Sequence, residues 1–181
     1  MTKNESIERS TQDILREARV NLCPVDIGAV ARANGIELRF DDLEKEVSGI
    51  LLAKSGVRTI VVNSTHSLIR RRFTIAYILG RFQSPTLGSD VLIVFNRINH
   101  FTRASSVIDW RSMTNTDELD HVVGLQFASA ILLPEPDVQA RTFNEYNWDE
   151  NDIASLASLY EVSELTMVQR LLCLNIIKPR S

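Results

Sequence analysis

Ten residues near the middle of the chain, FTIAYILGRF (73–82), constrain the fold more than any other stretch. Their apolar side chains recur three and four residues apart and leave almost no polar face, which is typical of a helix buried in a core. Ser64 or Thr65 can cap such a helix with a side-chain oxygen. We therefore expect a buried helix over residues 65–83.

The segments around this helix predict both strands and helices. Alternating and β-branched residues indicate a small sheet with a hairpin over residues 36–63, and a further short strand over 91–95. Helical periodicity predicts an N-terminal helix over 5–19 and a later helix over 116–133. The predicted fold class is α+β.

The polar and acidic stretch 144–151 predicts a boundary between a domain over 1–143 and a helical segment over 144–181. This last segment has the spacing of a helix-turn-helix pair, with Ser163 as the cap of its second helix. A helix that reads DNA presents cationic side chains, whereas this pair follows an acidic lead-in that phosphates would repel. We therefore expect the pair to pack on the core, and contact with DNA is the alternative.

The stretch FTIAYILGRF matches, in its packing positions, a helix written FTIAHELGHF, and LQFASAILLPEPDV is similar to a segment written EANxFAAxLLMP. Both patterns belong to the ImmA/IrrE family of small metallopeptidase-like proteins, which cleave repressors of phage, mobile-element or stress-response genes. Further segments resemble the family in the same order: VDIGAVARANGIELRF, GILLAKSGVRTIVVN and DIASLASLYEVSELTMVQRL. The resemblance covers most of residues 24–175. It implies a zincin-like domain, a small sheet with a hairpin packed on helices, followed by a helix-turn-helix-like pair.

In that family the helix supplies two histidine ligands of a zinc ion and a glutamate that acts as general base. Tyr77 and Arg81 stand at the histidine positions, Ile78 at the glutamate, and Val123 at the third ligand. Arginine has no free lone pair, isoleucine and valine have no donor atom, and tyrosine is a poor zinc ligand unaided. The resemblance therefore implies a site without catalytic residues, metal or cofactor.

None of the three histidines of this chain stands at a sequence position from which it could replace the missing zinc ligands. His66 precedes the buried helix, and His100 falls in a loop-like stretch. His121 lies two positions before Val123, so a helix should turn it about 200° away from the supposed site. Glu118, Asp120 and His121 could bind a metal loosely, but an exposed polar first turn of the helix is the favoured interpretation.

We expect the four replaced positions, Tyr77, Ile78, Arg81 and Val123, to fill the former metal cavity with side chains. Two interpretations of Arg81 stay open. Its guanidinium can stack on the ring of Tyr77, four residues away on the same helix face, as a cation–π pair. It can equally extend along the surface and place its charge in solvent.

The middle of the chain is basic. Eight arginines against two aspartates give residues 58–111 a net charge of +6, although the whole chain carries −3. Such an asymmetry indicates either a contact surface for an anionic partner or solvated helix and loop faces. The candidate partner-binding residues are Arg70, Arg71, Arg72, Arg81, Arg97 and Arg103.

These observations favour an inactive ImmA/IrrE-like protein that regulates transcription by binding a protein partner, either a helix-turn-helix repressor or an active relative. Two alternatives stay open: an active metallo-endopeptidase of that family with a non-standard site, and a nucleic-acid-binding regulator that uses the arginines. No apolar run reaches the roughly 18 residues of a membrane span, and no secretory signal is evident. We therefore expect a cytoplasmic protein.

Overall fold

The computed structural model describes residues 3–20, 23–83, 90–96, 116–142 and 148–178. Within these ranges the chain forms an α+β fold of seven helices and four strands, so the predicted fold class is confirmed at that level. The helices are α1 (Lys3–Glu17), α2 (Ile27–Ala33), α3 (Leu68–Arg81), α4 (Thr116–Leu132), α5 (Glu135–Thr142), α6 (Glu150–Tyr160) and α7 (Glu164–Cys173). The strands are β1 (Ile36–Asp41), β2 (Val47–Lys54), β3 (Val57–Asn63) and β4 (Val91–Asn96). No helix in the described ranges is both long enough and apolar enough to span a membrane.

The four strands form one mixed sheet in the order β1-β3-β2-β4. The predicted hairpin is present, because β2 and β3 pair antiparallel around a turn in which Ser55 and Gly56 both have positive φ. β1 pairs parallel with β3, and the strand predicted over 91–95 pairs antiparallel with β2 at the other edge. The hairpin therefore forms the centre of the sheet.

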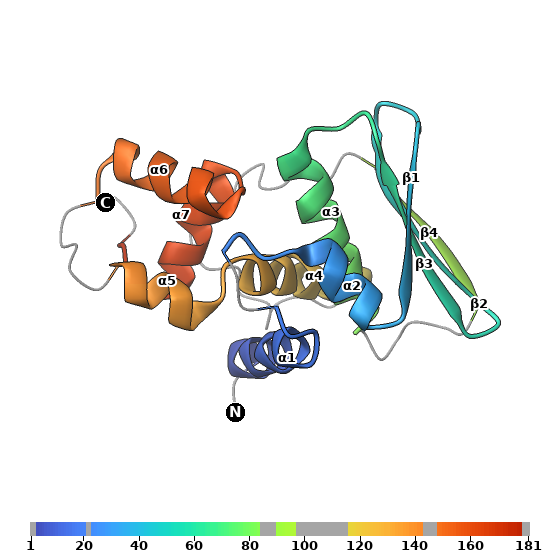
Figure 1. The fold of residues 1–181 in the computed structure, drawn as a ribbon, viewed down its shortest axis with the longest axis horizontal. Helices are drawn as coiled ribbons and strands as arrows, with labels where there is room; N and C mark the ends of the chain where they lie inside the picture. Colours follow the sequence, from blue (N-terminus) through green and yellow to red (C-terminus); the bar gives the residue numbers. More distant parts are fainter. Residues whose placement is uncertain (1–2, 21–22, 84–89, 97–115, 143–147, 179–181) are drawn as a thin grey trace.

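Helices cover one face of this sheet (Figure 1). α3 contacts β2 and β3, and α2 contacts β1. Gly49 of β2 lets α3 lie close to the sheet. A Cβ atom at this position would collide with the side chains of Thr74 and Ile78 in the helix. The helix predicted to be buried is therefore held between the sheet on one side and α4 on the other.

α3 begins later than the sequence predicted. Its first residue is Leu68, and its N-cap is Ser67, whose side chain accepts from the backbone N–H of Arg70. The prediction of Ser64 or Thr65 as the cap is wrong. The physical reason is Asn63, whose side-chain oxygen accepts from both the backbone N–H and the hydroxyl of Thr65 and holds a separate turn before the helix.

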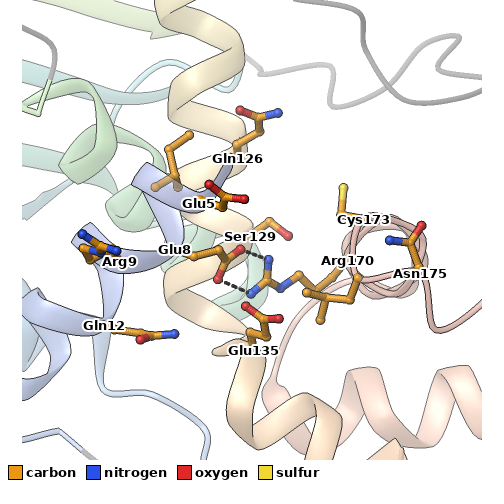
Figure 2. Close-up of a pocket in the computed structure, with 12 residues that line it drawn as sticks. Glu5, Glu8, Arg9, Gln12, Gln126, Ser129, Glu135, Arg170, Cys173 and Asn175 are labelled. Carbon is orange, nitrogen blue, oxygen red and sulfur yellow. Dashed lines mark hydrogen bonds and ion pairs between the residues drawn. The ribbon is translucent and has the colours of Figure 1, made fainter. Parts of the chain in front are cut away.

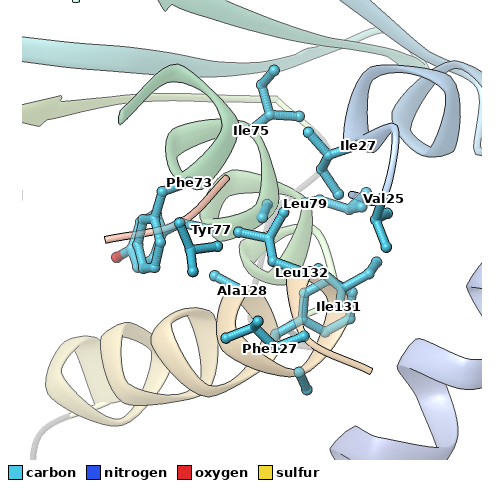
Figure 3. Close-up of a cluster of buried hydrophobic side chains, with 14 of the residues drawn as sticks. Val25, Ile27, Phe73, Ile75, Tyr77, Leu79, Phe127, Ala128, Ile131 and Leu132 are labelled. Atoms are coloured by element: carbon cyan, nitrogen blue, oxygen red, sulfur yellow. The ribbon is translucent and has the colours of Figure 1, made fainter. Parts of the chain in front are cut away.

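The hydrophobic core is centred on α3 and α4 (Figure 3). Every residue from Arg72 to Arg81 is buried, which confirms the expectation of a core helix. Leu79 packs in the same cluster as Phe127, Ala128 and Ile131 of α4. Apolar burial of this kind stabilises the fold without any metal ion.

The C-terminal helices contact the rest of the chain through buried polar groups. Arg72 of α3 donates to the carbonyl of Tyr160 at the end of α6, at 3.3 Å. Arg170 of α7 donates to the carbonyl of Leu133 and pairs with both carboxylate oxygens of Glu8 in α1. The predicted cap of α7 is confirmed, since the side chain of Ser163 accepts from the N–H of Thr166. The division of the chain at residues 143 and 144 stays a prediction.

Candidate functional site

The four positions singled out by the sequence resemblance lie on α3 and α4, and these two helices pack against each other. Their contact is the candidate site. Two glycines let the helices approach each other closely. A Cβ atom at Gly80 would lie 2.8 Å from Cβ of Phe127, and one at Gly124 would lie 2.8 Å from Cε2 of Tyr77. Real side chains are not found this close, so any larger residue at either position would push the helices apart.

Tyr77 fills the space that Gly124 leaves open. The residue is 2% exposed, and its ring packs edge-on against the ring of Phe95 in β4, with 5.2 Å between the centroids. Burial raises the pKa of its phenol to about 12, although the charge of Arg81 lowers the pKa in part. The hydroxyl therefore keeps its proton at neutral pH.

His121 contacts the site, and the prediction that it points away is wrong. Its Nδ1 lies 2.8 Å from the hydroxyl oxygen of Tyr77, and the two rings meet edge to face. The reason is the rotation of α4: Gly124 faces α3, so His121 stands beside this contact and the long phenol reaches it. With the imidazole proton on Nε2, the hydroxyl donates to Nδ1.

Arg81 follows neither of the two interpretations left open by the sequence. Its side chain is 9% exposed, which excludes the solvent-reaching arrangement. Its Nη1 instead lies 3.6 Å from a carboxylate oxygen of Asp120, whose side chain is 14% exposed. Asp120 therefore belongs to the helix contact and not to an exposed first turn. Nε and Nη1 of Arg81 are buried without a hydrogen bond.

The two remaining motif positions contribute only apolar packing. Ile78 is fully buried and lies against the sheet, close to the backbone of Gly49. Val123 is partly buried and packs on the hydrophobic core. On a helix it stands 100° from Gly124, on the side opposite to His121.

These residues do not fit a zinc ion. Tyr77 keeps its proton, and the cationic Arg81 beside it would repel a second positive charge. His121 and Asp120 are the remaining donors at the contact, and a catalytic zinc site requires three protein ligands. Among all described residues, no three His, Cys, Asp or Glu side chains come together as a possible metal site. His66, the other described histidine, lies before α3 and contacts the carbonyl of Lys45.

The structure describes four of the six candidate partner-binding arginines and does not bring them together on one surface. Arg72 and Arg81 are buried and pair with Glu161 and Asp120, respectively. Arg70 and Arg71 are partly buried near the start of α3. Arg97 and Arg103, like His100, lie outside the described residues. A partner could use Arg72 and Arg81 only by breaking internal ion pairs.

A cavity that no sequence pattern indicated lies between α1, α4, α7 and the start of α5 (Figure 2). Its volume is about 540 Å³, within the range of small-molecule sites. Arg170 and Glu8 occupy its wall as an ion pair, and the side-chain oxygen of Gln126 is buried there without a hydrogen bond. Residues from four helices, with α1 and α7 near opposite ends of the chain, form this cavity, so no local pattern could have predicted it.

Neither a comparison with models of protein families nor a comparison with curated proteins finds a match for this chain.

Proposed function

We propose that this protein is a catalytically inactive, ImmA/IrrE-like pseudo-peptidase that regulates transcription by binding a protein partner. The observation that carries the proposal is the filled contact between α3 and α4. Tyr77 occupies the space over Gly124 and bonds to His121, while Arg81 pairs with Asp120. Every described side chain at this contact is engaged with another side chain, and none is arranged to activate a water molecule.

Peptide hydrolysis by this class of site needs a polarised water and a base. Ile78 stands at the position of the base and has no titratable atom. A tyrosine with a pKa of about 12 holds its proton too tightly to act as a base at neutral pH. Loss of a positioned base alone typically lowers the rate about 10²–10⁴-fold.

A scaffold of this kind stays folded without the chemistry. The packing positions of α3, from Phe73 to Leu79, are apolar or small and buried, so the core does not depend on a metal. A protein that acts by binding a partner needs the fold and does not need the catalytic residues. The partner that the resemblance favours is a helix-turn-helix repressor or an active relative of the same family.

The test is an incubation of the protein with the helix-turn-helix repressor encoded nearest to its gene, with added zinc, with added manganese, or with a chelator. We expect a stable complex by size-exclusion chromatography and an intact repressor under all three conditions. A cut that the chelator prevents would contradict the proposal and favour an active metallo-endopeptidase. Absence of a complex with that repressor and with active relatives would also contradict it.

A further inference from the structure

The cavity between α1, α4, α7 and the start of α5 is separate from the contact between α3 and α4 (Figure 2). α1 and the end of α7 form its walls, and α4 lies between them with Gln126 and Ser129. Because a water molecule takes up about 30 Å³ of the liquid, a volume of about 540 Å³ has room for a small organic molecule.

The ion pair of Arg170 and Glu8 joins the two walls and engages the whole guanidinium. Nε of Arg170 donates to the carbonyl of Leu133, and Nη1 and Nη2 each bond to a carboxylate oxygen of Glu8. Arg9, the other cation among the described lining residues, is exposed. The cavity therefore offers an anionic ligand little that its own carboxylates have not already taken.

The charged groups that remain are acceptors. Glu5 and Glu135 give the described lining three carboxylates against two guanidiniums. Glu135 accepts one hydrogen bond, from Gln139 at 2.9 Å, whereas a carboxylate has about four acceptor positions. Figure 2 shows Glu5 and Glu135 on opposite sides of the ion pair. Negative charge is therefore spread along the cavity.

Gln126 adds an acceptor that the fold leaves unsatisfied. Its Oε1 is buried without a hydrogen bond, which costs free energy that a donor would recover. The last torsion of a glutamine side chain is broad, so a half-turn of the amide brings this oxygen to the cavity. A ligand that donates an N–H there would remove the cost.

A metal ion does not match this lining. In the part of the chain that the structure describes, no three His, Cys, Asp or Glu side chains meet at one point to hold an ion. Acceptors that are spread out match a ligand whose positive charges are separated and carry N–H donors.

We propose that this cavity binds a small linear organic cation with primary ammonium groups, a diamine or polyamine. One ammonium group bonds to Glu135, and another bonds to the amide oxygen of Gln126. The inference does not depend on the proposed function, because the cavity shares no residue with the filled contact of Tyr77 and Arg81. Since its walls belong to α1 and α7, the bound cation stabilises the position of the C-terminal helices.

The test is a calorimetric titration of the full chain with 1,5-diaminopentane. We expect saturable binding at one site per chain and a raised thermal midpoint. Gln126→Leu and Glu135→Gln should each weaken binding about tenfold or more, because each removes a partner of an ammonium group. Glu164→Gln is the matched control: Glu164 stands in the first turn of α7 as Glu135 does in α5, is exposed and lies outside the cavity. It should bind as the unchanged chain does.

Two further probes separate a built site from attraction between charges. Bis(trimethylammonium)pentane has the same charge and no N–H donor, so it should bind at least about tenfold more weakly, and glutarate should not bind. The position of the site is read from Cys173, which lines the cavity. The diamine should slow the reaction of Cys173 with a thiol reagent, followed by mass spectrometry, and leave the rate at Cys23 unchanged.

Four results would overturn the proposal. Equal affinity for the two dications would mean attraction of charge without donor recognition. Tighter binding of glutarate would make the cavity an anion site. Binding that Gln126→Leu and Glu135→Gln leave unchanged would place the diamine elsewhere. No saturable binding of 1,5-diaminopentane or of spermidine would leave the cavity without this ligand. If Gln126→Leu does not fold, Gln126→Met, which keeps the length of the side chain, replaces it.

Discussion

At the scale of single residues, the hydroxyl of Tyr77 links α3 to the exposed side of α4. Tyr77→Phe removes this hydrogen bond and keeps the ring over Gly124. We expect a loss of about 1 kcal/mol in the free energy of unfolding, measured with urea, because water can replace the hydroxyl at Nδ1 of His121. Tyr77→Leu, which also removes the ring, should cost more. Equal losses for the two variants would contradict a filling role for the ring.

The same pair predicts a dependence of stability on pH. Burial, and next the charge of Arg81, lower the pKa of His121 below its ordinary 6.5. The unfolded chain therefore takes up a proton near pH 6.5 that the folded chain resists, so this contribution to stability is present above that pH and is lost as the pH falls toward the folded pKa.

His121→Gln tests this dependence, because glutamine keeps a polar side chain and does not titrate. Urea unfolding of both proteins at about pH 7.5 and about pH 5 provides the measurement. The unchanged chain should lose more stability between these conditions than the variant does. The effect should be small, because only the part of the imidazole against Tyr77 is shielded from water and the residue as a whole remains exposed. Identical losses would show that His121 titrates normally in the folded chain.

At the scale of elements, the approach of α3 to α4 depends on Gly124. Alanine in place of a helical glycine ordinarily stabilises a helix by about 1 kcal/mol. Here Gly124→Ala should instead destabilise the protein by about 1–3 kcal/mol, because the new methyl group overlaps the ring of Tyr77. In a Tyr77→Leu background most of this overlap is absent, so the same substitution should become neutral or stabilising. A stabilising effect of Gly124→Ala in the unchanged chain would contradict the described packing.

Local sequence patterns predicted a helix or strand well where its residues alone carry the signal. The apolar run 73–82 predicted the buried helix, and the hairpin strands followed from their residue types and turn. The predicted cap of α3 was wrong because the hydroxyl of Thr65 donates to the side chain of Asn63 and is not available to cap the helix. The contact of Tyr77 with His121 could not be predicted, since it depends on how α4 is rotated against α3 and not on the period of either helix.

At the scale of the whole molecule, one buried ion pair joins the two ends of the chain. Arg170 of α7 is 4% exposed in its side chain and pairs with Glu8 of α1. Glu8→Gln would leave the guanidinium buried without its counter-charge, so we expect a loss of about 3 kcal/mol in the free energy of unfolding.

Glu37→Gln provides the matched control for that substitution. Glu37 pairs with Arg39 on the sheet surface, where both side chains are about half exposed, so its loss should cost at most about 1 kcal/mol. Urea titrations followed by circular dichroism measure both variants. Similar losses for the two would mean that α7 does not depend on α1 for its position.

The measurement that tests the central claim most directly is the zinc content of the tag-free protein, purified without chelator and dialysed against metal-free buffer. Under the proposed function, Tyr77, Ile78, Arg81 and Val123 stand in place of zinc donors, and in the structure side chains fill the contact between α3 and α4. We therefore predict far less than one zinc per chain and a thermal midpoint that a chelator does not change. One zinc retained per chain, and lost in His121→Ala, would contradict the account.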